Sequence, residues 1–289
     1  MKIRNPVTTI LSITGMCFAA SLMAQNDRFA NVTIETVAVA GGISMLIGSG
    51  GNIGVSAGDD GILIIDDQYA PLGAKIKAAL ADLGSDTPKF LLNTHFHGDH
   101  TGGNADFGIN SIIVAHENVR SRLVAGDAPA SALPVVTYDD DVTIHFNGED
   151  ITLIHMPAGH TDTDSVVMFA DSNVIHMGDH FFNGGFPFVD LASGGTVQGY
   201  LQNLEKALSW IGDDTAVIPG HGPLGTKSDL LNFYNVVKDT STAIRVMKSQ
   251  RMSKEEIVAA GLGDEYESWG QGFINEQRWI ETVFDSYPR

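Results

Sequence analysis

The sequence predicts a protein of the α/β (α+β) class in which two β-sheets carry helices on their outer faces. Short apolar or alternating segments, separated by glycines and other turn residues, recur as far as residue 218 and indicate strands. Segments with apolar residues three or four positions apart indicate helices, which dominate the end of the chain. The order of meander, helix, polar loop, second meander and helices describes two similar halves, each a sheet covered by helices.

Each strand and helix is expected from a local pattern of apolar residues. Strands are expected at residues 32–39, 43–47, 53–56, 61–65, 89–93, 111–115, 142–146, 151–156, 165–169, 173–177 and 216–218. Helices are expected at 72–83, 117–124, 197–211, 230–237, 253–261 and 273–287, the last with a buried face of Phe273, Ile280, Val283, Phe284 and Tyr287. Residues 126–134, rich in alanine and proline, are expected to form a surface loop.

Length and charge limit the partners of the protein. The chain has 289 residues, with no repeat at a fixed period and no clear linker, which favours one compact domain. Lysine and arginine number 17 against 35 acidic residues, a formal charge of -18. This charge argues against nucleic acid and anionic membrane surfaces as partners, because their phosphates would be repelled. We expect a small-molecule substrate, and the sequence makes no prediction about the oligomeric state.

Residues 1–24 have the pattern of a secretory signal peptide. Lys2 and Arg4 form a basic start, a mostly apolar segment follows, and Ala24 is a plausible cleavage position. An ordinary buried helix is the alternative. Threonines and serines interrupt the apolar segment, which argues against a membrane anchor. We therefore expect a periplasmic or secreted protein. Removal of the signal would also remove Cys17, the only cysteine, and any metal would then be held by His, Asp or Glu.

Three histidines and a carboxylate crowd into six positions after the strand at 89–93: His95, His97, Asp99 and His100. Gly98 and the following glycine pair are expected to prevent regular structure, so this set is expected on a loop at a strand end. His95 and His97 lie two positions apart, and a locally extended backbone projects both imidazoles to one side. Asp99 and His100 are then free to turn toward a second point, which suggests one pair of ligands per metal.

The ligand types in this loop are those that zinc accepts, since imidazole nitrogen and carboxylate oxygen are borderline-hard donors. A polar loop with merely exposed histidines is the alternative, which four potential ligands in six residues disfavour. Three later segments place a polar residue beside glycine after an apolar strand and offer further donors: Gly159-His160-Thr161, Gly178-Asp179-His180 and Pro219-Gly220-His221-Gly222-Pro223.

In this combination the sequence resembles the metallo-β-lactamase superfamily. Its ligand motifs are matched in order by His95, His97, Asp99, His100, His160, Asp179 and His221, over a region from about 50 to 221. The resemblance implies a single domain, residues 25–289, built as a four-layer αββα sandwich with a helical C-terminal segment and metals at the shared edge of the sheets.

The same resemblance implies two Zn²⁺ per chain. His95, His97 and His160 would hold the first zinc. Asp99, His100 and His221 would hold the second, and Asp179 would bridge both. Asp99 would also be catalytic, because it could orient a hydroxide that bridges the metals.

The other histidines are expected to be structural: His116, His145, His155 and His176. His180 is either structural or a partner of a ligand or substrate. Thr161 and Asp162 are candidates to orient His160 by hydrogen bonding. The segment Phe181–Phe188 is expected either to line the substrate pocket or to pack in the core. Lys206 is the only lysine between positions 179 and 212, so no cation is expected near a substrate carboxylate.

These features predict an exported zinc-dependent hydrolase that opens a small cyclic amide or ester, as a β-lactamase does. Asp179 stands where some relatives carry a cysteine ligand, and aspartate there is more typical of lactonases and glyoxalase-type thioesterases. A lactonase or such a thioesterase is therefore the alternative. From another class, the same ligands would suit a di-iron redox protein or a metal-binding scaffold without catalysis.

Overall fold

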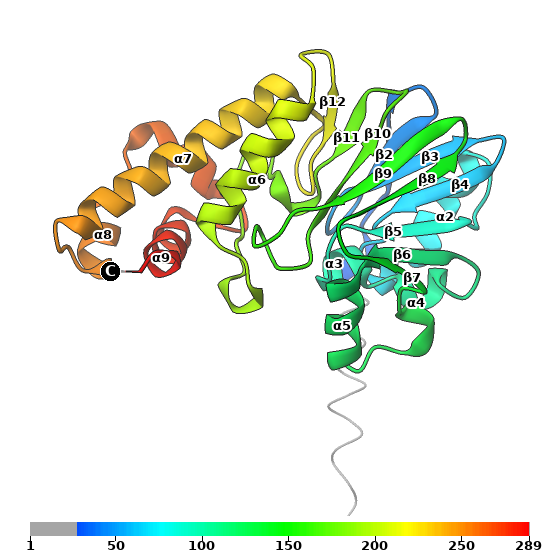
Figure 1. Cartoon of the computed structure of the whole chain (residues 1–289), viewed down its shortest axis with the longest axis horizontal. Coiled ribbons are helices and arrows are strands. Elements are labelled where there is room, and N and C mark those ends of the chain that lie inside the picture. The colour runs from blue at the N-terminus through cyan, green and yellow to red at the C-terminus, as the bar shows by residue number, and fades with distance from the viewer. Residues whose placement is uncertain (1–27, 289) are drawn as a thin grey trace, which may run out of the picture.

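Two β-sheets pack face to face, and helices cover the outer face of each sheet (Figure 1). The structure, a computed structural model, describes residues 28–288, so the predicted signal peptide lies outside the described residues. This layer order confirms the predicted αββα sandwich. Within residues 28–288, no helix is both long and apolar enough to cross a lipid bilayer.

The first sheet follows the order of the chain from β1 to β7. Its strands are β1 (Glu35–Ala40), β2 (Ile43–Ile47), β3 (Ile53–Gly58), β4 (Gly61–Ile65), β5 (Phe90–Asn93), β6 (Ile112–His116) and β7 (Val136–Tyr138). The meander from β1 to β4 is antiparallel, whereas β4, β5, β6 and β7 are parallel neighbours. The parallel strands send their carboxyl ends to one edge.

The second sheet has the order β13-β12-β11-β10-β9-β8. Its strands are β8 (Asp141–Phe146), β9 (Glu149–His155), β10 (Ser165–Phe169), β11 (Val174–His176), β12 (Ala216–Ile218) and β13 (Gly225–Thr226). Because β10 is antiparallel to both β9 and β11, and β11 is parallel to β12, the strands β9, β11 and β12 point the same way. Their carboxyl ends therefore also share an edge.

The helices fall into two sets. With the first sheet lie α2 (Gly73–Asp82), α3 (Gly98–Thr101), α4 (Asn104–Phe107) and α5 (Glu117–Ala125), and with the second α6 (Val197–Trp210), α7 (Lys227–Ser249), α8 (Lys254–Ala260) and α9 (Glu276–Ser286) (Figure 1). Short 3-10 helices are η1 (Ala70–Leu72), η2 (Ala130–Ala132), η3 (Gly178–His180), η4 (Leu191–Ser193) and η5 (Asp264–Gln271).

Three apolar clusters hold the layers together. Between the sheets, Leu63 and Leu92 of the first pack in one cluster with Leu153 and Val167 of the second. On the outside of the first sheet, the apolar stripe of α2 completes a second cluster. The third joins the second sheet to α6, α7, α8 and α9. Fully buried apolar side chains contribute about 1.5–3 kcal/mol each, so these clusters dominate the stability of the sandwich.

Local structure differs from the prediction in several places, among them the unpredicted strand β13 and the longer helix α7. Gly98 begins the one-turn helix α3, and α4 follows directly, although the glycines were expected to prevent regular structure. Glycine is permissive rather than forbidding, and bonds from the amides of 100 and 101 to the His97 carbonyl close the first turn. The unpredicted strand β7 follows the loop at 126–134. Phe273 lies outside α9, which starts after the cap Asn275, and is 73% exposed instead of buried.

Substitution of Trp279, on α9, tests whether the C-terminal helices belong to the same folding unit as the sheets. The side chain is fully buried, and its Nε1 donates a hydrogen bond to Thr240 Oγ1 at 2.9 Å. Trp279→Ala should lower the free energy of unfolding by about 3–5 kcal/mol, because a large cavity is left. Urea denaturation should show one shifted transition, whereas Leu231→Ala, at a half-exposed position, should change stability by under about 0.5 kcal/mol. Two separate transitions would contradict the prediction of a single domain.

Candidate metal centre

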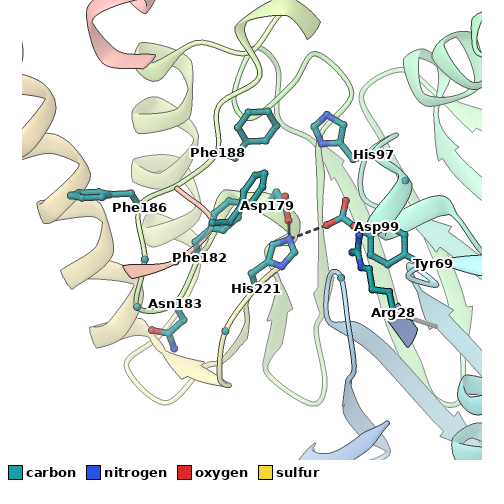
Figure 2. A pocket seen from close by; sticks show the side chains of 17 residues that line it. Arg28, Tyr69, His97, Asp99, Asp179, Phe182, Asn183, Phe186, Phe188 and His221 are labelled. Atoms are coloured by element: carbon teal, nitrogen blue, oxygen red, sulfur yellow. Dashed lines mark ion pairs between the residues drawn. The ribbon is translucent and has the colours of Figure 1, made fainter. Parts of the chain in front are cut away.

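All seven predicted ligands lie at the edge where strand ends of both sheets meet. His95 and His97 follow β5, and Asp99 and His100 lie on α3. The other three come from the second sheet: His160 from the loop after β9, Asp179 from η3 after β11, and His221 from the loop after β12. Figure 2 shows His97 and Asp99 on one side of this edge and Asp179 and His221 on the other.

Hydrogen bonds between the two sheets fix this edge. The amide of Ser165, at the start of β10, donates to the carbonyl of Thr94 at 2.7 Å. The amide of Asn52 donates to the Gly220 carbonyl at 2.7 Å, and its side chain donates to the carbonyls of Pro219 and Gly222 at 3.0 and 2.9 Å. The loop that carries His221 is thereby tied to the first sheet.

The seven side chains form two groups, each with ligand atoms within 4.8 Å of one another: His95, His97, His160 and Asp179, and Asp99, His100 and His221. Asp179 contacts both groups. Its Oδ2 lies 3.4 Å from His160 Nε2 and 3.8 Å from His95 Nε2. Its Oδ1 lies 3.0 Å from His100 Nε2 and 3.3 Å from His221 Nε2. One carboxylate oxygen therefore faces each group, which is the geometry of a bridging ligand.

Outer hydrogen bonds orient the histidines of the first group. His160 Nδ1 donates to the Phe188 carbonyl at 2.6 Å, and His97 Nε2 donates to Asp190 Oδ2 at 3.1 Å, because both partners only accept. His95 Nδ1 donates to Thr94 Oγ1 at 3.0 Å, since that hydroxyl gives its own proton to a carboxylate. Each neutral ring then turns a lone pair toward the centre, as metal-binding histidines do.

Asp66 orients a histidine of the second group, His100, in the same way. Its Oδ2 accepts from His100 Nδ1 and from Thr94 Oγ1, both at 2.7 Å, and its Oδ1 accepts from the Thr94 amide at 2.8 Å. The carboxylate is fully buried, and its residue has a φ of 63°, which is uncommon outside glycine. A single side chain thus positions His100 and, through Thr94, His95.

The donor atoms of both groups suit a pair of cations. His95 Nε2, His100 Nε2 and Asp179 Oδ1 are buried and have no hydrogen-bond partner within residues 28–288, which is costly unless another group satisfies them. His97 Nδ1 and His160 Nε2 lie 2.8 Å apart, and with both rings neutral their lone pairs would repel each other. Two cations would remove both problems, and nitrogen with carboxylate oxygen is a donor set suited to zinc.

The pKa values divide the histidines. Burial, together with the neighbouring imidazoles, lowers the pKa of His95 well below its usual range, and burial lowers that of His160 to about 4. Burial would also lower the pKa of His221, but the carboxylates of Asp179 and Asp99 raise it to about 9. The carboxylates of Asp179, Asp99 and Asp66 likewise raise the pKa of His100 well above its usual range. Protons on these two rings therefore balance the carboxylates when no cation does.

Two glycines allow the ligands to approach the backbone. A Cβ at Gly51 would collide with the His100 ring, and a Cβ at Gly220 would collide with Asp179 Oδ1 and the backbone of Gly178. Alanine at either position would displace a ligand, because the conflicting atoms are held by other bonds. The glycine next to a predicted ligand therefore has a steric role here.

The two ligand groups open into a cavity of about 640 Å³. Phe182, Phe186 and Phe188 line it, whereas Phe181 packs in the core beside Phe233, so the segment Phe181–Phe188 has both of its expected roles. Arg28 also lines the cavity, opposite these phenylalanines (Figure 2). The sequence analysis looked for a cation only around the late ligands, and Arg28 lies outside that region.

Residues next to the ligands differ in their roles from the prediction. Asp162 binds Arg122 at 2.6 Å and Thr161 binds Asp164, so neither orients His160. His180 belongs to neither ligand group. It is buried, accepts from Asn203 Nδ2 at 3.0 Å and stacks on Tyr200.

The four histidines expected to be structural also lie outside both ligand groups. His116 stacks on His155, His176 binds the Asn52 carbonyl, and His145 pairs with Asp150 on the surface.

Asp66 and Asp190 are the functional residues that the sequence analysis missed. Asp66 directly follows β4, and a polar residue just after an apolar strand is the same signal that identified the later ligands. Asp190 has no such signal, because it lies in an irregular segment between β11 and α6. Only the fold brings it next to His97.

This fold and this donor set define a class of protein. Residues 48–221 match the model of the metallo-beta-lactamase superfamily, and the chain belongs to that superfamily of metal-dependent hydrolases. The match ends at His221, the last predicted ligand.

Among curated proteins, the chain is 30% identical over 134 residues to a hydroxyacylglutathione hydrolase of Polaromonas sp. (strain JS666 / ATCC BAA-500), which covers 45% of this chain and 47% of that protein. It is 28% identical over 176 residues to the probable metallo-hydrolase YqgX of Bacillus subtilis, and this match covers 57% of this chain and 82% of that protein. The chain thus spans about half the length of the hydroxyacylglutathione hydrolases it matches.

Solved structures share the fold at low identity. A metallo-beta-lactamase from Pontibacter korlensis superposes with a TM-score of 0.62 at 17% identity, covering 71% of this chain and 99% of that one. The DIM-1 metallo-beta-lactamase superposes with a TM-score of 0.60 at 18% identity, and the match covers 72% of this chain and 99% of that one. At these identities the likeness concerns the fold alone.

Asp66→Asn should weaken zinc binding about 10- to 100-fold, because in either orientation its amide NH₂ faces a donor, His100 Nδ1–H on one side or the Thr94 amide on the other. Competition with a chelator measures this affinity. The matched control is Asp67→Asn. Burial raises the pKa of Asp67 well above its usual range, and its Oδ1 only accepts from the Gly103 amide at 2.8 Å, which an amide oxygen can also do. Equal affinities in both variants would contradict a positioning role for Asp66.

Zinc binding should release about two protons per chain near pH 7, because His100 and His221 must lose their protons to act as ligands. Their raised pKa values mean that protons compete with metal at neutral pH, so zinc affinity should rise with pH until about 9. Calorimetric titrations in two buffers with different ionisation enthalpies count the protons. A pH-independent affinity without proton release would show that these histidines are not ligands.

Proposed function

We propose that the protein is an exported hydrolase that uses two zinc ions per chain to open a small cyclic amide or ester. The observation that carries this proposal is the placement of Asp179, with one oxygen beside each of the two ligand groups. Bridged groups of nitrogen and oxygen donors suit a pair of zinc ions, and neither group contains a sulfur ligand. Export rests on the N-terminal pattern of residues 1–24.

The bound metals would supply Lewis acidity and a nucleophile near neutral pH. Asp99 is the residue of this chain best placed to handle a proton. Its side chain is 24% exposed, lines the cavity, and lies 3.4 Å from His221 Nε2. Burial would raise its pKa, but His100 and a hydrogen bond from His221 lower it. Asp99 is therefore ionised at neutral pH and can orient a water molecule and accept its proton.

The aromatic side of the cavity suits an organic substrate. Phe182 stacks on the His221 ring at a centroid distance of 5.0 Å, and the Phe188 ring lies 5.6 Å from that of His160. These rings cover one side of the ligand groups with apolar surface, which binds hydrocarbon and excludes water. Arg28 lies across the cavity and suits an anionic group (Figure 2).

A thioester is the second candidate substrate. The curated relatives named as hydroxyacylglutathione hydrolases favour it, as does aspartate at position 179. The predicted export favours the cyclic amide or ester, because the usual thiol conjugates are cytoplasmic.

A hydrolysis screen of the mature, zinc-loaded protein separates these possibilities. The panel contains β-lactams, lactones, thioesters and phosphodiesters. We expect the highest kcat/KM for a lactam or lactone, whereas preference for thioesters would replace the first candidate by the second. Turnover of no substrate would favour a metal-binding scaffold.

Metal analysis of protein as purified should find two zinc ions per chain, and a coloured iron protein would favour the redox alternative.

Asp99→Ala should lower kcat/KM about 100-fold, a loss of about 2.7 kcal/mol of transition-state stabilisation. Because Asp99 is also a predicted ligand, zinc content must be measured in the same samples, and rates compared at saturating zinc. Asp106→Ala, which removes an exposed carboxylate paired with Lys77, is the control and should keep normal turnover. Near-normal turnover of Asp99→Ala would refute its catalytic role.

A further inference from the structure

Phe273 is an exposed aromatic side chain at the mouth of the cavity. It belongs to the C-terminal segment beyond His221, where the match to the superfamily ends. The residue is 73% exposed, yet it lines the cavity together with Gly272. Its neighbour Ile274 is 2% exposed and packs in the core. The backbone that presents Phe273 is thus anchored, and the exposed ring is held in place next to the cavity.

The ring of Phe273 continues the aromatic surface that starts at the ligands. It lies edge-on to Phe188 at a centroid distance of 6.0 Å, and Phe188 in turn lies 5.6 Å from the His160 ring. The guanidinium of Arg278, on α9, lies 4.8 Å from the Phe273 centroid and 5.3 Å from that of Phe188. Such cation–π contacts hold an arginine over the rings while its N–H groups stay available.

Arg278 supplies a positive charge that the described residues do not neutralise. Its side chain is exposed, and among residues 28–288 the ion pairs of lysine and arginine involve Lys77, Arg122, Lys227 and Lys254 only. In a chain with a formal charge of -18, such a cation beside two rings that line the cavity is a local attraction for anions. The apolar ring and the charge lie next to each other.

We infer that Phe273 and Arg278 form an outer subsite, which accepts a planar aromatic group carrying a negative charge. This group would lie on the part of the substrate remote from the bond that is cleaved. The inference rests on the proposed function in so far as the cavity binds the substrate. The subsite selects among substrates and takes no part in the chemistry, since both residues lie outside the two ligand groups.

Equilibrium binding of two matched probes tests the subsite without turnover. The probes are naphthalene-2-sulfonate, an anion with weak affinity for zinc, and its neutral N,N-dimethylsulfonamide, each titrated calorimetrically into the zinc-loaded protein. The sulfonate should bind about fivefold more tightly, the upper range for an exposed ion pair. Arg278→Gln should reduce this preference, leaving only the contribution of Arg28 across the cavity. Phe273→Ala should weaken binding of both probes about fivefold, because the ring contact is lost.

Two matched controls lie away from the cavity. Arg245 is also an exposed arginine over an aromatic ring, that of Tyr287, and Leu231 is a half-exposed apolar residue on α7. Arg245→Gln and Leu231→Ala should leave both affinities unchanged. The inference is overturned if neither probe binds, or if the preference for the anion is undiminished in Arg278→Gln. Hydrolysis plays no part in this measurement, so its outcome is independent of the substrate screen.

Discussion

A carboxylate with 5% of its side chain exposed lies among four imidazoles at the edge shared by the two sheets. A buried charge of this kind is stable only when opposite charge and hydrogen bonds surround it. Asp179 meets this requirement through ligands that arrive from both sheets. Burial would raise its pKa, but the imidazoles hold it well below the usual range. The buried charge of Asp179 is therefore stable only when the two sheets pack so that their imidazoles surround it.

Acceptors outside the ligand groups decide which nitrogen of each ring faces the centre. Asp66, Asp190 and the Phe188 carbonyl each accept a hydrogen bond from the outer N–H of one ring. Phe188 has a second role, because its ring lines the cavity while its carbonyl orients His160. The surface offered to a substrate and the orientation of a metal ligand are thus coupled through one residue. Substitutions of the cavity wall at this position would be expected to alter both.

The part of the chain that matches the superfamily carries all seven ligands, whereas the C-terminal segment adds a wall to the cavity. This division agrees with the general rule that a scaffold holds the chemistry while loops determine the substrate. The buried Trp279 and Ile274 anchor the added segment to the second sheet. Residues that affect which substrate binds can therefore lie on an anchored segment outside the loops that carry the ligands.

Much of the fold was predictable from local patterns. Alternation and helical stripes depend on neighbouring residues, so most strands and helices lie where the sequence placed them. The segments that carry the ligands were predictable too, because histidines and carboxylates beside glycines at strand ends give a local signal. The complete ligand set, with Asp179 in place of His180, came from the resemblance to the superfamily. The exposure of Phe273 was not predictable, since its apolar character alone favours burial. The helix starts three residues later than expected, and Phe273 is left at the cavity.

The sequence by itself determined the class of the fold, the seven candidate ligands and a metal-dependent chemistry. Only the tertiary structure decided that Asp66 holds His100, that Asp190 holds His97, and that Arg28 and Phe273 face the same cavity. The physical reason is that local periodicity reports how each segment is built. Contacts between residues far apart in the chain depend on how two sheets and their helices pack, which no single segment encodes.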